Sequence, residues 1–378
     1  MEDLDGQHQC HPGLQLNMTN RVSDAPFVSV VMPVRGIAPF IKLALDSIGN
    51  QSGIEFEIIC IDDGVAESTL EQIKEFSVRS GRLRLVVNHG DGIVDALNTG
   101  LSYAKGQFVA RMDSDDIALA GRLAAQAAFL GAFPEIGVLG TQATLIDANG
   151  APLRILHVPI GADRVDAALQ ISCALIHPTV MMRLDVVREA GGYRHGFDGA
   201  EDYELWLRLR WRTKLDNLAQ PFLLYRRHEG QVTLRRQFHQ ARLAALAVVG
   251  NRLRQSHGVD VTAALDEPKK WRAFLAKISA SSVDDVRNLT ACSLADNGGT
   301  LRASGARYLR LACRIAVVRG SPEVRDRLAL ACVRHQVHLW RSGRWSEALR
   351  AVAFDLVRWR TKMLSAYYQH ASTVWRSK

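Results

Sequence analysis

The chain has 378 residues, of which 47% are hydrophobic and 23% charged, a composition that is typical of globular domains and excludes collagen-like, low-complexity and wholly disordered chains. Its length suggests roughly two or three domains. The formal net charge of +8 is unevenly distributed, because acidic side chains are in excess over residues 1–240 and basic side chains over residues 241–378, so we expect two units with different partners.

The cysteines and the N-terminus bear on the cellular compartment. The six cysteines are scattered without a C-x-x-C pair, which argues against a disulfide framework or a thiolate zinc site. The first residues are acidic where a secretory signal would be basic, and no apolar run approaches the ~20 residues that span a bilayer. We expect a cytoplasmic protein, or one peripherally associated with a membrane.

Strand and helix patterns alternate after residue 26. Residues 1–25 lack an apolar period and are expected to form a flexible leader. The predicted strands cover residues 28–32, 56–61, 83–87 and 108–112, and the predicted helices between them cover residues 37–48, 71–79 and 92–104. Such alternation predicts an α/β fold with a mostly parallel sheet flanked by helices.

Two carboxylate clusters follow predicted strands, at the edge of the sheet where α/β folds bind ligands. Asp62-Asp63-Gly64 follows the second strand, and Asp113-Ser114-Asp115-Asp116 follows the fourth. Three crowded carboxylates raise each other's pKa unless a cation neutralises them, and Mg²⁺ or Mn²⁺ prefers such oxygen ligands. An acidic turn before a helix beginning near Ile117, and an ordinary Asp-Asp-Gly turn, are the alternatives.

A third acidic focus and one histidine come later in the chain. Glu201 and Asp202 follow a glycine-rich loop and open an apolar helical pattern, so Asp202 could cap that helix or act as a base aimed into the cleft. His228 stands among cations, where a lone histidine is more often a surface residue than a ligand.

Residues 241–378 show helical rather than strand periodicity. One apolar stripe consists of Trp345, Leu349, Val352, Leu356, Trp359 and Met363. We expect a small, basic, all-α domain. Its charge could bind nucleic acid or an anionic membrane surface, but tryptophans on the apolar stripe are better used in a core, so nucleic acid is disfavoured.

Several motifs occur together in a characteristic order. They are residues 28–33, Asp62-Asp63-Gly64, residues 88–106, residues 110–116, His177-Pro178-Thr179, Gly191-Gly192-Tyr193, Glu201-Asp202 and His228. This order resembles glycosyltransferase family 2 over about residues 26–235. The resemblance implies a GT-A fold, a Rossmann-like α/β domain over residues 26–240, and an inverting transferase that uses Mn²⁺ or Mg²⁺.

The resemblance also implies roles for individual residues. Asp202, paired with Glu201, would be the general base, and Asp115 would bind the metal, with His228 reaching the metal or the diphosphate. The implied nucleotide-sugar-binding residues are Pro33, Arg35, Asp62, Asp63 for the base and Asp113 for the ribose. Arg35-Gly36 stands where the family usually has Tyr-Asn, and Val65 where it has Ser, which leaves the base and sugar preference open.

The predicted function is transfer of a sugar from a nucleoside-diphosphate-sugar to a hydroxyl of a saccharide or lipid-linked saccharide, as in cell-surface polysaccharide biosynthesis. A sugar-phosphate nucleotidyltransferase is one alternative, but the first strand is followed by Pro33-Val34-Arg35-Gly36 instead of a glycine-rich loop. A non-enzymatic protein that binds anions or nucleic acid through residues 241–378 is the other.

Overall fold

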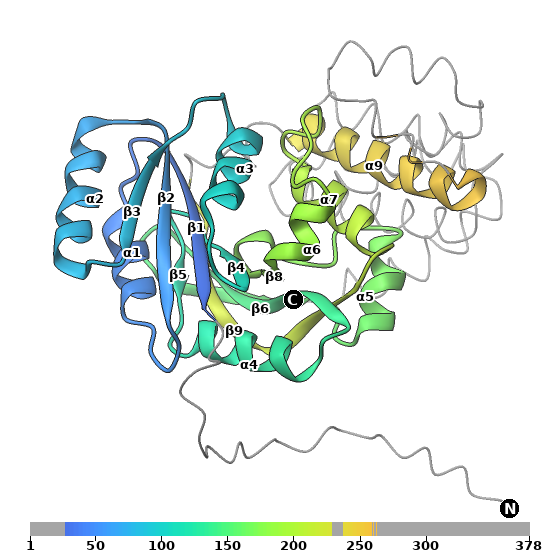
Figure 1. Cartoon of the computed structure of the whole chain (residues 1–378), viewed down its shortest axis with the longest axis horizontal. Coiled ribbons are helices and arrows are strands. Elements are labelled where there is room, and N and C mark those ends of the chain that lie inside the picture. Colours follow the sequence, from blue (N-terminus) through green and yellow to red (C-terminus); the bar gives the residue numbers. More distant parts are fainter. Residues whose placement is uncertain (1–26, 229–236, 259, 261, 263–378) are drawn as a thin grey trace, which may run out of the picture.

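The computed structural model describes residues 27–228, 237–258, 260 and 262. Within them a curled sheet of nine strands has the order β3-β2-β1-β4-β8-β6-β9-β5, with β7 paired to β6 outside this path (Figure 1). Helices cover both sides of the sheet. The predicted α/β fold, with a sheet flanked by helices, is therefore confirmed for this part of the chain.

The first part of the sheet is wholly parallel. Its strands are β1 (Val28–Gly36), β2 (Phe56–Val65), β3 (Leu83–Val87) and β4 (Phe108–Arg111), and its connecting helices are α1 (Ile41–Gly49), α2 (Glu67–Ser80) and α3 (Ile93–Tyr103). Each was predicted from periodicity. Strand residues of one parity pack on α3 and those of the other parity on α1 and α2, because successive side chains of a strand point to opposite faces.

The rest of the sheet is mixed in direction. It contains β5 (Ile117–Ala118), β6 (Ile136–Ile146), β7 (Pro152–Leu156), β8 (Met181–Arg183) and β9 (Lys214–Arg226). The pairs β4–β8, β6–β8, β5–β9 and β6–β7 are antiparallel, while β6–β9 is parallel. The mostly parallel arrangement thus holds for the first four strands. No helix begins near Ile117, because this residue lies in β5 and α4 (Arg122–Ala132) starts later.

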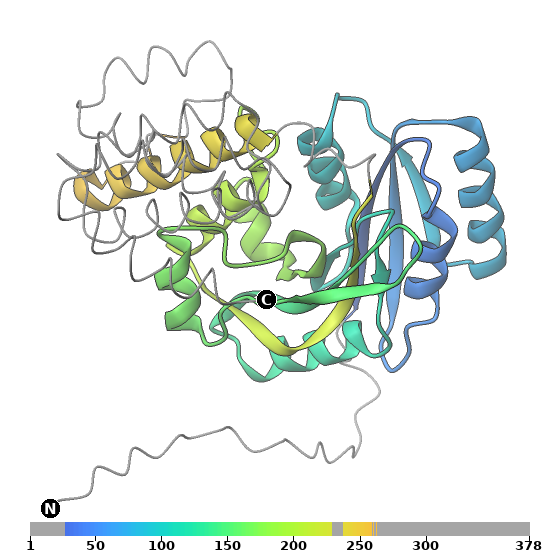
Figure 2. The same cartoon turned by 180° about the vertical axis from the view of Figure 1, so that it is seen from behind.

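The remaining helices gather on one side of the sheet. They are α5 (Ala162–Leu169), a 3-10 turn (His177–Thr179), α6 (Leu184–Glu189), α7 (Glu201–Leu209) and α9 (Gln237–His257). Figures 1 and 2 show α9 at the end of the molecule opposite to α2. Leu243 and Leu246 of α9 belong to the same buried cluster as Trp206 of α7.

Two expectations concern residues that the structure does not describe. The leader over residues 1–25 and nearly all of the predicted all-α domain over residues 241–378 lie outside the described part. The boundary at residue 240 stays a prediction, and α9 runs across it. Among the described residues, no helix has the length and apolar character needed to cross a bilayer.

Candidate active site

The carboxyl ends of β1, β2 and β4 bring the first two acidic clusters to one edge of the sheet. Val34 on β1 pairs with Asp62 on β2, so both strands end at the same level. In the sheet, β1 has β2 as its neighbour on one side and β4 on the other, so the order of strands changes direction at β1. Ligands of open α/β sheets bind at such a switch point.

Asp62 shapes its own turn. Its Oδ1 accepts hydrogen bonds from the backbone N–H groups of Gly64, at 3.1 Å, and Val65, at 2.8 Å. Gly64 has a φ of +81°, which a residue with a Cβ adopts only with strain. This Asp-Gly turn therefore presents the neighbouring Asp63 to the sheet edge, and a direct nucleotide contact of Asp62 stays a prediction.

Asp63 is held from three sides. Its Oδ1 accepts a hydrogen bond from the Asn88 amide at 2.7 Å and one from the Gly92 backbone N–H at 3.3 Å. Its Oδ2 lies 3.3 Å from Nη1 of the Arg35 guanidinium. Pro33, half-buried on β1, lies two positions before Arg35. The structure thus brings Asp63 and Arg35 together, while Pro33 shares the end of β1 with Arg35, and the nucleotide-binding roles of all three stay predictions.

The carboxylates after β4 form a compact group. Oxygen atoms of Asp113, Asp115 and Asp116 all lie within 4.8 Å of one another. Burial, followed by the charges of Asp113 and Asp115, raises the pKa of Asp116 well above its usual value. Burial also raises the pKa of Asp113, although this carboxylate pairs with Arg111. Oδ2 of Asp116 is buried without a hydrogen-bond partner among the described residues. This donor set fits a hard divalent cation.

His228 lies beside this group. Its Nε2 is 2.9 Å from Oδ2 of Asp115, and its ring packs against Phe40 with centroids 5.3 Å apart. The sequence-based expectation that a lone histidine among cations is a surface residue does not describe it, because its side chain is only 20% exposed. Its role as a metal or diphosphate ligand stays a prediction.

Arg226, which no pattern in the sequence singles out, organises the same loop. This buried arginine donates from Nε to the backbone carbonyl of Asp115 at 2.9 Å, and its own N–H donates to Oδ1 of Asp116 at 2.8 Å. Its guanidinium lies 4.3 Å from the ring centroid of Phe40. Arg226 stands next to the exposed Arg227, so only tertiary contacts distinguish the two.

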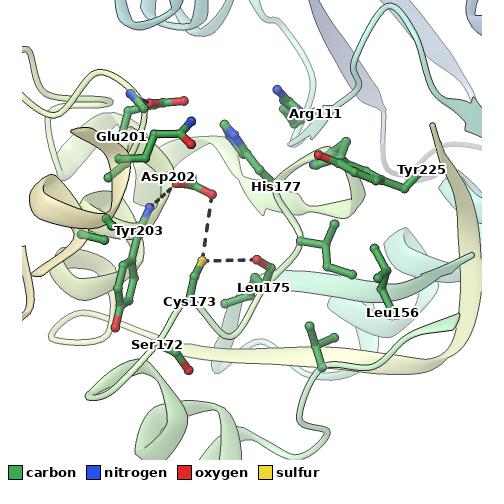
Figure 3. A pocket seen from close by; sticks show the side chains of 18 of the residues that line it. Arg111, Leu156, Ser172, Cys173, Leu175, His177, Glu201, Asp202, Tyr203 and Tyr225 are labelled. Atoms are coloured by element: carbon green, nitrogen blue, oxygen red, sulfur yellow. Dashed lines mark hydrogen bonds between the residues drawn. The ribbon is translucent and has the colours of Figure 1, made fainter. Parts of the chain in front are cut away.

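Glu201 and Asp202 open α7 and have different surroundings. Oε2 of Glu201 accepts the backbone N–H of Gly199 at 2.5 Å, and burial together with the charge of Asp202 raises the pKa of Glu201 to about 7. Oδ1 of Asp202 accepts the N–H of Tyr203 at 2.7 Å, and burial raises the Asp202 pKa. Oδ2 of Asp202 faces the thiol of Cys173, 4.0 Å away (Figure 3).

A cavity of about 730 Å³ joins the second and third acidic clusters. Asp113 and Asp202 both line it, and α9 contributes a wall of small and apolar side chains. The lining includes Arg111, Arg154, Leu156, Cys173, His177, Glu201, Tyr225, Gln240, Ala241, Ala244 and Val248 (Figure 3). Most of these were not predicted, since no local pattern links β7, the 171–178 loop and α9.

The His177-Pro178-Thr179 motif supports the cavity wall. Nε2 of His177 lies 2.9 Å from the hydroxyl of Tyr193, which follows Gly191-Gly192. Burial, aided by the charge of Arg111, lowers the pKa of His177 well below its usual value, so the ring is neutral at pH 7. Two motifs that are distant in the sequence therefore meet here through a neutral hydrogen bond.

The chain is similar in sequence to several known proteins. The family model described as glycosyl transferase family 2 matches residues 29–189. The O-antigen biosynthesis glycosyltransferase WbnJ of Escherichia coli is 32% identical over 219 residues, which cover 56% of this chain and 83% of WbnJ. The amylovoran biosynthesis glycosyltransferase AmsE of Erwinia amylovora is 31% identical over 173 residues, covering 45% and 63% of the two chains. The crystal structure of S. aureus TarS 1-349 in complex with UDP-GlcNAc has a TM-score of 0.49 and 17% identity, and the match covers 93% of this chain and 92% of that one.

Proposed function

The chain belongs to glycosyltransferase family 2, and from this membership we propose that it transfers a sugar, with inversion, from a nucleoside-diphosphate-sugar to a hydroxyl of a saccharide or lipid-linked saccharide. Its relatives in O-antigen and amylovoran biosynthesis support a role in making a polysaccharide. The observation that carries the proposal is the single cavity lined by both Asp113 and Asp202. It would hold the transferred sugar between the donor diphosphate and a base.

Asp202 acts as the general base. Its Oδ1 is occupied by the N–H of Tyr203, whereas Oδ2 faces the thiol of Cys173, a weak donor. Oδ2 takes the proton of the acceptor hydroxyl while that oxygen bonds to the anomeric carbon. The bond from the anomeric carbon to the diphosphate oxygen breaks, and its electron pair leaves with the nucleoside diphosphate. One displacement of this kind inverts the anomeric centre.

Glu201 and Asp202 are adjacent buried carboxyls, and burial raises the pKa of both. With a pKa of about 7, the Glu201 carboxyl is partly protonated there, and its buried Oε2 is already bound to the backbone of Gly199. Two adjacent buried carboxylates do not both ionise readily. Glu201 is therefore a supporting residue, and Asp202 is the proton acceptor.

The Asp113, Asp115 and Asp116 carboxylates, with His228 beside them, would hold Mn²⁺ or Mg²⁺. When bound, such an ion offsets the negative charge that develops on the departing diphosphate. Arg226 fixes the loop through Asp115 and Asp116. Asp63, with Arg35, Pro33 and Asp62, would hold the nucleoside, and Asp113 its ribose.

The remaining expectations concern location and the basic region. A cytoplasmic enzyme that docks peripherally on an anionic membrane through residues 241–378 would meet lipid-linked acceptors directly. Membership in the family excludes the alternative of a purely non-enzymatic protein, and it favours sugar transfer over the nucleotidyltransferase alternative. Flotation of the full chain with vesicles that contain or lack anionic lipid tests the docking.

The test of the activity is a donor screen. The full chain, with Mn²⁺ and a panel of nucleotide sugars, should consume one donor, as followed by mass spectrometry. Once an acceptor is found, NMR of the product should show the anomeric configuration opposite to that of the donor. Retention of configuration, or turnover that persists in Asp202→Asn, would contradict the mechanism.

A further inference from the structure

Arg35 forms an exposed bridge between two carboxylates at the end of β1. Its Nη1 lies 3.3 Å from Oδ2 of Asp63, and its Nη2 lies 3.4 Å from Oδ1 of Asp91. The side chain of Arg35 is 64% exposed and that of Asp91 91%, but that of Asp63 only 9%. The Arg35–Asp91 pair is exposed on both sides, and ion pairs of this type stabilise a fold little. The guanidinium is therefore free to turn its donors toward a ligand bound beside Asp63.

Asp63 has one oxygen left for a ligand. Oδ1 already accepts two N–H groups, from Asn88 and Gly92, so its lone pairs are used. Among the described residues, the ion pair of Oδ2 is with Arg35. The pair thus presents one carboxylate acceptor next to a planar fork of N–H donors.

The acceptor of Asp63 and the donors of Arg35 together match the hydrogen-bonding edge of one type of nucleobase. Uracil and thymine carry a single ring N–H between two carbonyl groups. In the same pose, cytosine and adenine would set an unprotonated ring nitrogen against Oδ2 of Asp63. Guanine would bring a second N–H toward Oδ1, which is occupied. A buried donor without an acceptor, or two acceptors in contact, costs binding free energy.

We propose that Arg35 determines the base of the nucleotide donor, selecting the imide edge of uracil or thymine together with Asp63. Oδ2 of Asp63 accepts the ring N–H, and Arg35 donates to the neighbouring carbonyl. This inference rests on the proposed function, which sets a nucleotide at this edge of the sheet. It gives a use to the Arg35-Gly36 pair that departs from the family pattern.

Calorimetric binding to the full chain with Mn²⁺ tests the inference without turnover. UDP, dTDP, GDP and CDP are titrated into the unaltered protein, into Arg35→Ala and into Arg35→Lys. The unaltered protein should bind UDP or dTDP about ten-fold more tightly than GDP and CDP, and Arg35→Ala should lose that preference, in keeping with one hydrogen bond from a charged donor. Arg35→Lys keeps the charge but not the fork, so it should retain affinity for GDP while losing most of the preference. Comparison of UDP with dTDP separates the uracil from the thymine edge.

Lys42→Ala is the matched control. Lys42 is also 64% exposed and pairs with one carboxylate, that of Asp46 on the same helix, so its removal should leave all four affinities unchanged. An equal loss for all four nucleotides in Arg35→Ala would overturn the inference, because Arg35 would then act on the diphosphate charge. Tightest binding of GDP or CDP would also overturn it. Absence of binding of every nucleotide to the unaltered protein would instead contradict the proposed function.

Discussion

Nε2 of His228 lies 2.9 Å from Oδ2 of Asp115, although the two residues stand 113 positions apart in the chain. The end of β9 thereby meets the loop after β4. A neutral imidazole nitrogen and a carboxylate oxygen are both metal ligands, so their approach concentrates ligand atoms at one point. This contact links the acidic cluster after β4 to the residues that directly follow β9.

His228→Ala should weaken binding of Mn²⁺ by about 10–100-fold, the range for groups that bind or orient a metal ligand. Electron paramagnetic resonance of free Mn²⁺ measures this affinity without any turnover. His195→Ala is the control, because His195 forms a similar pair with Asp95, at 3.1 Å, outside the acidic cluster. Equal Mn²⁺ affinity in both variants would remove His228 from the metal site.

Asp202→Asn should lower kcat by about 10²–10⁴-fold, because the amide cannot accept the acceptor proton, while the affinity for the nucleotide stays the same. Steady-state rates and calorimetry give the two quantities. Asp185→Asn is a close control, since Oδ1 of Asp185 accepts the next backbone N–H at 2.8 Å at the start of α6, as Asp202 does in α7. A comparable loss of kcat in the control would mean that the helix start, not the base, was damaged.

The parallel part of the fold could be predicted because each of its strands is a run of apolar residues and each of its helices has apolar residues at helical spacing. The short strands β5 and β8, of two and three residues, are too brief to carry a period. The acidic clusters could be found in the sequence because their acidic residues are neighbours in the chain. The sequence could not show that Asp62 binds its own turn whereas Asp63 faces Arg35, because this difference depends on the directions of the two side chains. The wall of the cavity on α9 likewise depends on tertiary packing.

Glu201→Gln should change how stability depends on pH. The pKa of Glu201 rises from 4.5 to about 7 on folding, so between these values the folded chain holds more protons than the unfolded chain. The free energy of unfolding of the native chain therefore falls as pH rises through this window, by up to about 3 kcal/mol, and is flat above it. The glutamine variant should have a shallower slope, because the raised carboxyls of Asp113, Asp116 and Asp202 remain.

Urea denaturation at a series of pH values between 4.5 and 8 measures that slope. The exposed Glu189→Gln is the control and should follow the native curve. A native curve that is flat across the window would contradict the raised pKa. Near pH 8 the variant should be more stable than the native chain, since a buried charge has been removed.

Arg226→Ala should destabilise the fold by more than about 2 kcal/mol and also weaken Mn²⁺ binding, because several buried groups lose their partner together. The guanidinium donates to the carbonyl of Asp115 at 2.9 Å and to that of Ala148 at 3.1 Å, so it ties the acidic loop after β4 to the turn between β6 and β7. Arg227→Ala, an exposed neighbour of the same charge, should change neither quantity by much. Urea denaturation and Mn²⁺ titration of both variants decide the matter. If Arg226→Ala lost stability but bound Mn²⁺ as the native chain does, the loop would keep its shape without this arginine, and Arg226 would be a purely structural residue.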